Sequence, residues 1–261
     1  MDISSSFWGW AFFKGSDNVK KKPAILIIHG LGEGIEDNEN FFNFIQSTHK
    51  FDVYMFSLPG SNRKNRIKKG YHDWLDVAEE NVKKLEEEYD DIYIVGHSMG
   101  GVLSCFLASM HNIKKLVLVA PAFGILNLNQ NIKDVKAKLK GNQMDVSPDS
   151  KTFYEIVLSR FLSVPIASYK NFIVFTHKYK NTARYVKCDT LVIYGNADEI
   201  VPKTAVDKAY DLLQSENKIY IEYDKVGHVV FQSNRKDEIN NDIYNFLIGG
   251  KKWTQKKKHK K

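Results

Sequence analysis

The sequence predicts one large α/β domain, with a mainly parallel sheet, helices on both of its faces and a helical insertion. Short, nearly unbroken apolar runs alternate with segments of helical periodicity, as in repeated strand-helix-strand units. One apolar run, residues 91–95, is followed closely by Ser98, which lies between Gly96 and Gly100. A strand, a very tight turn and a helix start would place this serine at the sheet edge. A Cβ at either glycine would collide with a neighbouring strand or helix.

The size and composition of the chain fit a single globular domain. Its 261 residues, 43% of them hydrophobic, are enough for a proper core. Cys105 and Cys188 form no CxxC pair and show no metal-ligand spacing, so neither a disulfide framework nor a zinc site is expected. The N-terminus lacks the basic region of a signal peptide, and no apolar run is long enough to span a membrane. We therefore expect a cytoplasmic protein.

The net charge of +7 is concentrated at the C-terminus. Seven lysines lie between Lys251 and Lys261; without them, the 38 basic residues fall to 31, equal to the 31 acidic residues. A neutral body argues against a specific nucleic-acid binder, which would spread basic charge over a folded face. We expect residues 249–261 to form a disordered basic tail. With Trp253, this tail suits weak, reversible contact with an anionic membrane, although a merely solvated tail is the alternative.

The expected elements follow from the hydrophobic patterns along the chain. Unbroken runs such as residues 24–28 favour strands buried on both faces. The predicted strands are 8–14, 24–28, 52–57, 91–95, 115–120, 190–195 and 218–223. The predicted helices are 41–49, 74–88, one beginning at Met99, one near 203–213 and one at 236–247. Residues 122–187 contain no convincing parallel strand, so we expect a helical cap there, inserted between core segments 1–121 and 188–248.

Ser98 needs a base to take its proton, and histidine suits that task near neutral pH. In this fold class the partners follow the serine in the order acid, then histidine. Of the eight histidines, only His228 and His259 follow the last predicted strands, and His259 lies among the tail lysines. His228 is therefore the candidate base. Activity should then fall below about pH 6 to 6.5, the ordinary titration range of histidine.

The candidate acid is Asp198, which follows the predicted strand 190–195 at its carboxyl end, where open α/β sheets place their sites. Asp189 precedes that strand and should lie at the opposite edge. Glu199 and Asp224 are weaker rivals, and a plain turn aspartate is the alternative interpretation of Asp198. Its expected role is to hold His228 in the tautomer that accepts the proton and to stabilise the imidazolium.

An oxyanion formed at Ser98 would need two fixed donors. The backbone N–H of Met99, the residue after the serine, is one candidate, and that of Leu31, after His29 and Gly30, is the other. A dinucleotide fingerprint in this glycine-rich stretch is disfavoured, because the third glycine would fall at Ile35. We expect His29 to be a structural hydrogen-bonding residue.

Several motifs occur in an order that resembles a known family. The motifs are HGLG, LPG, DWLDV, GHSMGG, YGNADEIVP and GHVVF. Up to Leu247 the chain is similar to small bacterial carboxylesterases and monoacylglycerol lipases of the α/β-hydrolase superfamily. The resemblance implies the α/β-hydrolase fold, a catalytic triad of Ser98, Asp198 and His228, and an oxyanion hole at Leu31 and Met99. Pro59-Gly60-Ser61-Asn62 replaces the PGHG of many relatives, and the insertion matches no one relative closely, which leaves the substrate open.

We therefore expect a serine hydrolase that cleaves small carboxylic esters through an acyl-enzyme on Ser98, without a metal or organic cofactor. Monoacylglycerols and lysophospholipids are candidate substrates, and we expect Phe153, Phe161 and Phe172 of the insertion to line an acyl pocket. A serine at this position excludes dehalogenases and epoxide hydrolases, which need a carboxylate nucleophile. An acyl thioesterase or serine peptidase would use the same triad. A catalytically silent binding protein is the alternative from another class.

Overall fold

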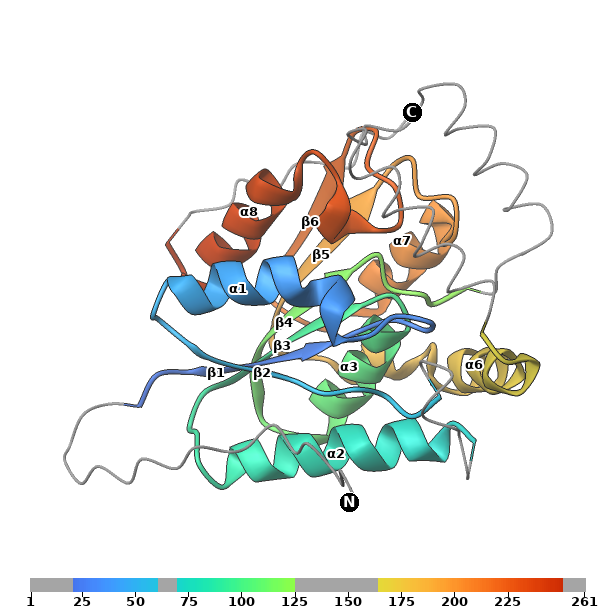
Figure 1. Ribbon diagram of the computed structural model, residues 1–261, viewed down its shortest axis with the longest axis horizontal. Coiled ribbons are helices and arrows are strands. Elements are labelled where there is room, and N and C mark those ends of the chain that lie inside the picture. The colour runs from blue at the N-terminus through green and yellow to red at the C-terminus, as the bar shows by residue number, and fades with distance from the viewer. Residues whose placement is uncertain (1–20, 61–69, 125–163, 251–261) are drawn as a thin grey trace, which may run out of the picture.

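The computed structural model describes residues 21–60, 70–124 and 164–250 of the chain (Figure 1). They form one six-stranded sheet with strand order β2-β1-β3-β4-β5-β6, in which every neighbouring pair is parallel. The strands are β1 (Ala24–Ile28), β2 (Asp52–Met55), β3 (Ile92–His97), β4 (Ile113–Val119), β5 (Asp189–Gly195) and β6 (Lys218–Tyr223). The predicted parallel α/β architecture is confirmed.

Helices cover both faces of the sheet (Figure 1). They are α1 (Glu39–Ser47), α2 (His72–Glu86), α3 (Met99–Met110), α6 (Ile166–Tyr179), α7 (Lys203–Leu212) and α8 (Lys236–Ile248). Side chains of α1 and α8 form one hydrophobic cluster with the sheet, and side chains of α2, α3, α6 and α7 form the other. In β1, Ile25 and Ile27 face the first cluster while Leu26 and Ile28 face the second. Because successive strand residues alternate between faces, this explains why β1 is apolar throughout.

Several strand boundaries differ from the prediction by one or two residues. The strand expected at 52–57 ends at Met55, and the strand expected at 91–95 runs on to His97. β2 pairs with β1 alone among the described strands, whereas β3 lies between β1 and β4 and still pairs with β4 at His97. A strand with partners on both sides is extended further by its ladder hydrogen bonds than one at an edge.

Lys115 of β4 anchors the C-terminal end of α8. Its Nζ donates hydrogen bonds to the carbonyl oxygens of Phe246 at 2.8 Å and Leu247 at 2.9 Å. The last carbonyls of a helix have no partner within it, and a cation there also complements the helix dipole. Gly249 then ends the helix with a left-handed φ of 70°. Lys115 thereby secures the helix that follows the predicted His228 loop.

The described part of the predicted cap packs onto the body of the protein. α6 and the short η2 helix (Thr182–Tyr185) both fall within residues 122–187. Phe175 of α6 is fully buried, and its ring lies 5.8 Å from that of Trp74 in α2. The predicted strand 8–14 lies outside the described residues, as do residues 125–163 and residues 251–261 of the predicted tail 249–261. The division into core and cap therefore stays a prediction.

Among the described helices, none is both long enough and apolar enough to cross a membrane.

Candidate active site

Ser98 occupies the tight turn between β3 and α3. Its φ of 53° and ψ of −118° lie in a left-handed region that residues other than glycine rarely adopt. Its N–H donates to the Val119 carbonyl at 2.9 Å, and its own carbonyl accepts from Gly101 and Ala122, both at 3.0 Å. Such a backbone costs about 1 to 3 kcal/mol and persists only where its surroundings hold it. These three hydrogen bonds supply that restraint.

The two glycines beside Ser98 are required by close backbone approaches. A Cβ at Gly100 would overlap the carbonyl oxygens of Ile28 and His29, and one at Gly96 would overlap the Gly100 carbonyl. The carbonyls belong to the main chain and cannot rotate away. The collision predicted for these two positions is confirmed.

Asp198 and His228 are in direct contact although they come from different strand ends. Asp198 follows β5 and His228 follows β6. The His228 Nδ1–H donates to Asp198 Oδ2 at 2.9 Å, and both side chains are buried. Asp198 Oδ1 accepts the main-chain N–H groups of Ile200 and Val201, both at 2.8 Å. Both carboxylate oxygens are thus hydrogen-bonded. Because Nδ1–H is donated to Asp198, Nε2 is the ring nitrogen of His228 that can accept a proton.

The three rival acids lie in other positions. Glu199 Oε2 accepts the main-chain N–H of His228 at 3.3 Å, so it contacts the backbone of that residue. Asp224 accepts from the Asn196 side chain at 2.9 Å, on the exposed side of the turn. Asp189 begins β5, at the end of the strand opposite Asp198. Asp198 is therefore the acid that bonds the imidazole ring.

The pKa of His228 is raised well above its ordinary value of 6.5. Burial by itself lowers this pKa, because the charged imidazolium is poorly solvated in the interior. The negative charge and hydrogen bond of Asp198, together with the charges of Glu199 and Glu33, outweigh the burial. The site is therefore built to stabilise a protonated His228.

The loop after β1 lies against Ser98. A Cβ placed on Gly30 would come within 2.9 Å of the Ser98 Cβ, so the main chain passes beside the serine at this point. Leu31 is the next residue and is buried, and Met99 is the first residue of α3, where helix N–H groups have no partner within the helix. Of the two predicted oxyanion donors, Leu31 thus follows the residue that lies against Ser98, and Met99 directly follows Ser98 itself.

His29 is a structural residue, as predicted. Its Nε2 accepts the Leu58 N–H at 3.0 Å, and its Nδ1–H donates to the Gly30 carbonyl at 2.8 Å. Burial lowers the pKa of His29, since the charged ring would lie in a poorly solvated position. Both nitrogens of a neutral ring are therefore used in holding the loop after β1.

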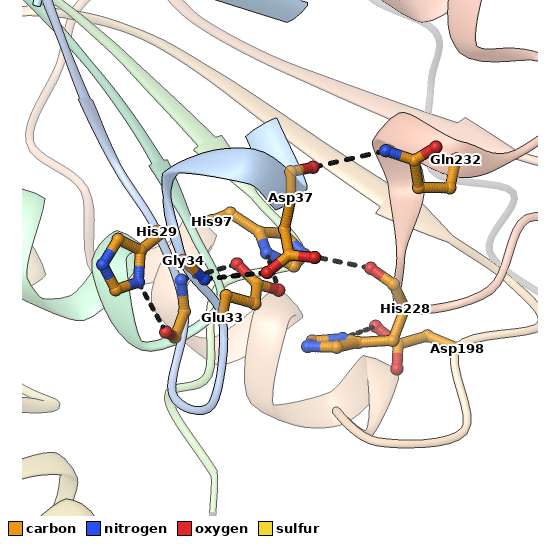
Figure 2. A network of polar contacts seen from close by, with 9 residues as sticks. His29, Glu33, Gly34, Asp37, His97, Asp198, His228 and Gln232 are labelled. Carbon is orange, nitrogen blue, oxygen red and sulfur yellow. Dashed lines mark hydrogen bonds and ion pairs between the residues drawn. The ribbon is translucent and has the colours of Figure 1, made fainter. Parts of the chain in front are cut away.

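Two buried polar residues beside the site were not singled out from the sequence. Figure 2 shows that Glu33, from the loop after β1, contacts His97, the residue before Ser98, and that His97 contacts the main chain of His228. The ring centroids of His97 and His228 are 5.0 Å apart. This contact brings the chain around Ser98 to the His228 loop. A charged residue within HGLGEG was the available sequence signal, but in a glycine-rich turn it resembles a solvated residue.

Of the three phenylalanines predicted to line an acyl pocket, Phe172 is the one that the structure describes. It lies on α6, is buried, and belongs to the hydrophobic cluster formed with α2 and α3. Phe153 and Phe161 lie outside the described residues. A role for these side chains in substrate binding stays a prediction.

Comparisons with known proteins agree with this architecture. The chain is 22% identical over 247 residues to the carboxylesterase of Bacillus subtilis (strain 168), covering 90% of this chain and 94% of that protein. It is also 22% identical over 236 residues to the phospholipase YtpA of the same organism, covering 82% and 91%. A soluble variant of monoglyceride lipase from Saccharomyces cerevisiae superimposes with a TM-score of 0.67 at 18% identity, covering 87% and 88%.

Fold and relatives together define an esterase-type hydrolase of the α/β-hydrolase superfamily, which confirms the predicted fold and class of enzyme. Residues 19–234 match the hydrolase family described as "Serine aminopeptidase, S33". The chain belongs to this family.

The strained backbone at Ser98 yields a stability prediction. Ser98→Gly should be more stable than Ser98→Ala by about 1 kcal/mol, because glycine adopts this φ and ψ freely whereas alanine keeps the strained Cβ. Urea denaturation of the two variants measures the difference in the free energy of unfolding. Equal stability, or a more stable alanine variant, would contradict a strained turn.

Proposed function

We propose that this protein hydrolyses carboxylic esters with Ser98 as nucleophile, His228 as general base and acid, and Asp198 as the residue that orients His228. The observation that carries the proposal is the buried hydrogen bond between Asp198 and His228 at the sheet edge where Ser98 is held in a strained turn. His97, the residue before Ser98, contacts the His228 carbonyl and so brings this turn to the His228 loop. A neutral His228 that donates Nδ1–H to Asp198 presents Nε2 to accept a proton.

In the first half-reaction, Ser98 Oγ attacks the ester carbonyl carbon while His228 Nε2 takes the hydroxyl proton. The carbonyl oxygen becomes an oxyanion, which the main-chain N–H groups of Leu31 and Met99 stabilise. The C–O bond to the alcohol then breaks, and the imidazolium returns its proton to the departing alkoxide. Alcohol is released and the acyl group remains as an ester on Ser98.

In the second half-reaction, water replaces the alcohol. The water oxygen attacks the acyl carbon while His228 takes a proton from the water. The main-chain N–H groups of Leu31 and Met99 stabilise the second oxyanion. The bond to Ser98 Oγ breaks, and the proton on His228 restores the serine hydroxyl. The products are a carboxylic acid and the resting enzyme.

Ester hydrolysis is favoured over aminopeptidase action because the acidic groups around His228 already bond to other groups of the protein. An aminopeptidase needs a carboxylate to bind the α-ammonium group of its substrate. Within the described part of the chain, the buried acids that act on His228 already bond internally: Asp198 to the His228 ring, Glu199 to the His228 main chain, and Glu33 to His97. An acyl thioesterase uses the same groups and remains the alternative, as does a catalytically silent binding protein.

We propose lipid-derived esters such as monoacylglycerols or lysophospholipids as the substrate class. Relatives of this chain are named carboxylesterase and phospholipase, and a structure of the same fold is named monoglyceride lipase. In this proposal Phe153, Phe161 and Phe172 line the acyl pocket, and the basic tail between Lys251 and Lys261 brings the enzyme to anionic membranes.

The triad proposal predicts non-additive losses. Ser98→Ala and His228→Ala should each lower kcat for p-nitrophenyl butyrate by several orders of magnitude, and the double variant should lose little more, because the residues act as one unit. A fluorophosphonate should label the native protein and leave Ser98→Ala unlabelled. Ser109→Ala, in α3, the helix that follows the turn at Ser98, is the matched control and should keep full activity. Additive losses, or labelling of Ser98→Ala, would refute the assignment; a native protein that takes no label would favour the silent binding protein.

The raised pKa of His228 corrects the pH dependence expected from the ordinary histidine range. Catalysis needs the neutral ring, so kcat/KM should fall as pH falls through the raised pKa, and the acid limb should lie above pH 6.5. Glu199→Gln should move the limb to lower pH, because the Glu199 charge contributes to raising the pKa. Exposed Glu216→Gln, the control, should leave it unchanged. A native limb at or below the ordinary value would show that the acidic neighbours do not outweigh the burial of His228.

The membrane proposal is tested by shortening the chain. A protein ending at Gly250 should lose salt-sensitive co-sedimentation with phosphatidylserine vesicles, since each lysine near an anionic surface contributes roughly 1 kcal/mol before screening. Its hydrolysis of a soluble short ester should match that of the full chain. If the full-length chain does not co-sediment with these vesicles even at low salt, the tail has no membrane role.

A further inference from the structure

Glu33 is a buried carboxylate that bonds in two directions. It lies in the loop after β1 and is 6% exposed. Its Oε2 accepts the Gly30 main-chain N–H at 2.7 Å, and its Oε1 lies 2.7 Å from His97 Nδ1 (Figure 2). Burial raises the pKa of this carboxyl, but the charge of His97 and the hydrogen bonds outweigh it and lower the pKa to about 2. Glu33 is therefore ionised, and a buried charge needs a partner.

His97 is bonded at both ring nitrogens to groups that accept hydrogen bonds. Nδ1 faces the Glu33 carboxylate, and Nε2 lies 3.0 Å from the His228 carbonyl oxygen. A neutral imidazole carries one N–H and can donate to only one of these acceptors. An imidazolium donates to both. The geometry thus favours a positively charged His97 paired with Glu33.

The pair connects the three parts of the candidate site. Gly30 belongs to the loop that carries the proposed oxyanion donor Leu31, His97 immediately precedes Ser98, and His228 is the proposed base. The chain of contacts runs from the Gly30 N–H through Glu33 and His97 to the His228 carbonyl. These contacts link the ends of β1, β3 and β6.

The polar groups of His228 show what this connection does. Its N–H donates to Glu199 at 3.3 Å, its Nδ1–H donates to Asp198 at 2.9 Å, and its carbonyl accepts from His97. Three of its four polar groups are thereby fixed by neighbours, and the fourth is Nε2, which exchanges the proton in the proposed mechanism. His97 is the contact that ties this arrangement to Ser98.

A second, parallel bridge joins the same two loops. Asp37, in the η1 helix (Ile35–Asn38), accepts the Gly34 N–H at 2.7 Å, and its main-chain carbonyl accepts from the Gln232 side chain at 3.3 Å. Gln232 ends η3 (Val230–Gln232), just after His228. The loop after β1 is therefore held to the His228 loop at two points (Figure 2). The Glu33–His97 pair is the one next to Ser98, because His97 directly precedes the serine in the chain.

We propose that Glu33 and His97 are positioning residues that hold the oxyanion loop and His228 in register with Ser98. The inference rests on the proposed function. Apolar residues of similar size can match a buried ion pair in stability. They cannot bind the Gly30 N–H and the His228 carbonyl at the same time, which is what the alignment of the two loops requires.

Substitution at Glu33 separates the hydrogen bonds from the charge. In Glu33→Gln the amide oxygen can accept from Gly30, and the amide N–H can donate to Nδ1 of a neutral His97, whose Nε2–H still donates to His228. All three contacts are then kept. Glu33→Ala removes two of them, and His97→Ala removes the bridge to His228.

The kinetic test compares these variants on p-nitrophenyl butyrate. Glu33→Ala and His97→Ala should lower kcat by about 10- to 100-fold with KM changed by less than about threefold, because misplacement of the reacting groups penalises the transition state more than binding. Glu33→Gln should restore kcat to within about threefold of the native value. Glu36→Ala, at an exposed carboxylate in the η1 helix three residues after Glu33, is the matched control and should resemble the native protein.

A spectroscopic measurement tests the charged pair in the resting protein, independently of catalysis. With ¹⁵N-labelled histidine, both ring nitrogens of His97 should carry protons under the conditions of the kinetic assay, because both face hydrogen-bond acceptors. In Glu33→Gln only one should do so. His97→Ala assigns the signals, so the test stands even if Glu33→Ala fails to fold.

Each outcome decides for or against the inference. A single protonated nitrogen on native His97, or a folded Glu33→Ala variant with the kcat of Glu36→Ala, overturns it. Failure of the proposed function is a separate result, because it appears as activity retained in Ser98→Ala whatever the state of His97.

Discussion

The close packing of the turn at Ser98 against the loop after β1 is the constraint on which the rest of the site depends. The backbone at Gly100 lies so close to the carbonyl oxygens of Ile28 and His29 that a Cβ at this position would overlap them. This contact fixes where α3 begins and forces Ser98 into a left-handed backbone. The strain, about 1 to 3 kcal/mol, is offset by hydrogen bonds to the neighbouring main chain. The serine is consequently held at the sheet edge before any substrate arrives.

A parallel sheet gathers the other groups around that serine. All strands run in the same direction, so the residues that follow β1, β3, β5 and β6 come out at one edge. His29, Ser98, Asp198 and His228 occupy these four positions. The helices on the two faces bury the strands on both sides, and Lys115 secures α8, which follows the His228 loop. The core thus serves as a rigid frame for residues that are distant in sequence.

Charge compensation organises the interior of the site. Asp198 with His228, and Glu33 with His97, form two acid–histidine contacts. Asp198 also accepts two main-chain N–H groups, and Glu33 accepts one. Buried charges without such partners would be costly. The contacts therefore favour one arrangement of the loops, and a site whose dipoles are oriented in advance needs little reorganisation during reaction.

The sequence by itself determined the parallel α/β architecture and the tight turn at Ser98, because apolar periodicity and glycine spacing are properties of local segments. The order of the strand ends made Asp198 the first candidate partner of His228, and the tertiary contact decided between it and its rivals Glu199 and Asp224. Tertiary structure alone decided that β2 ends at Met55, that the His228 pKa is raised, and that Glu33 bonds His97. These features depend on groups from separate strands and on their burial. In the sequence Glu33 is one acid in a glycine-rich turn, and only the packing of three strand ends makes it a buried partner of His97.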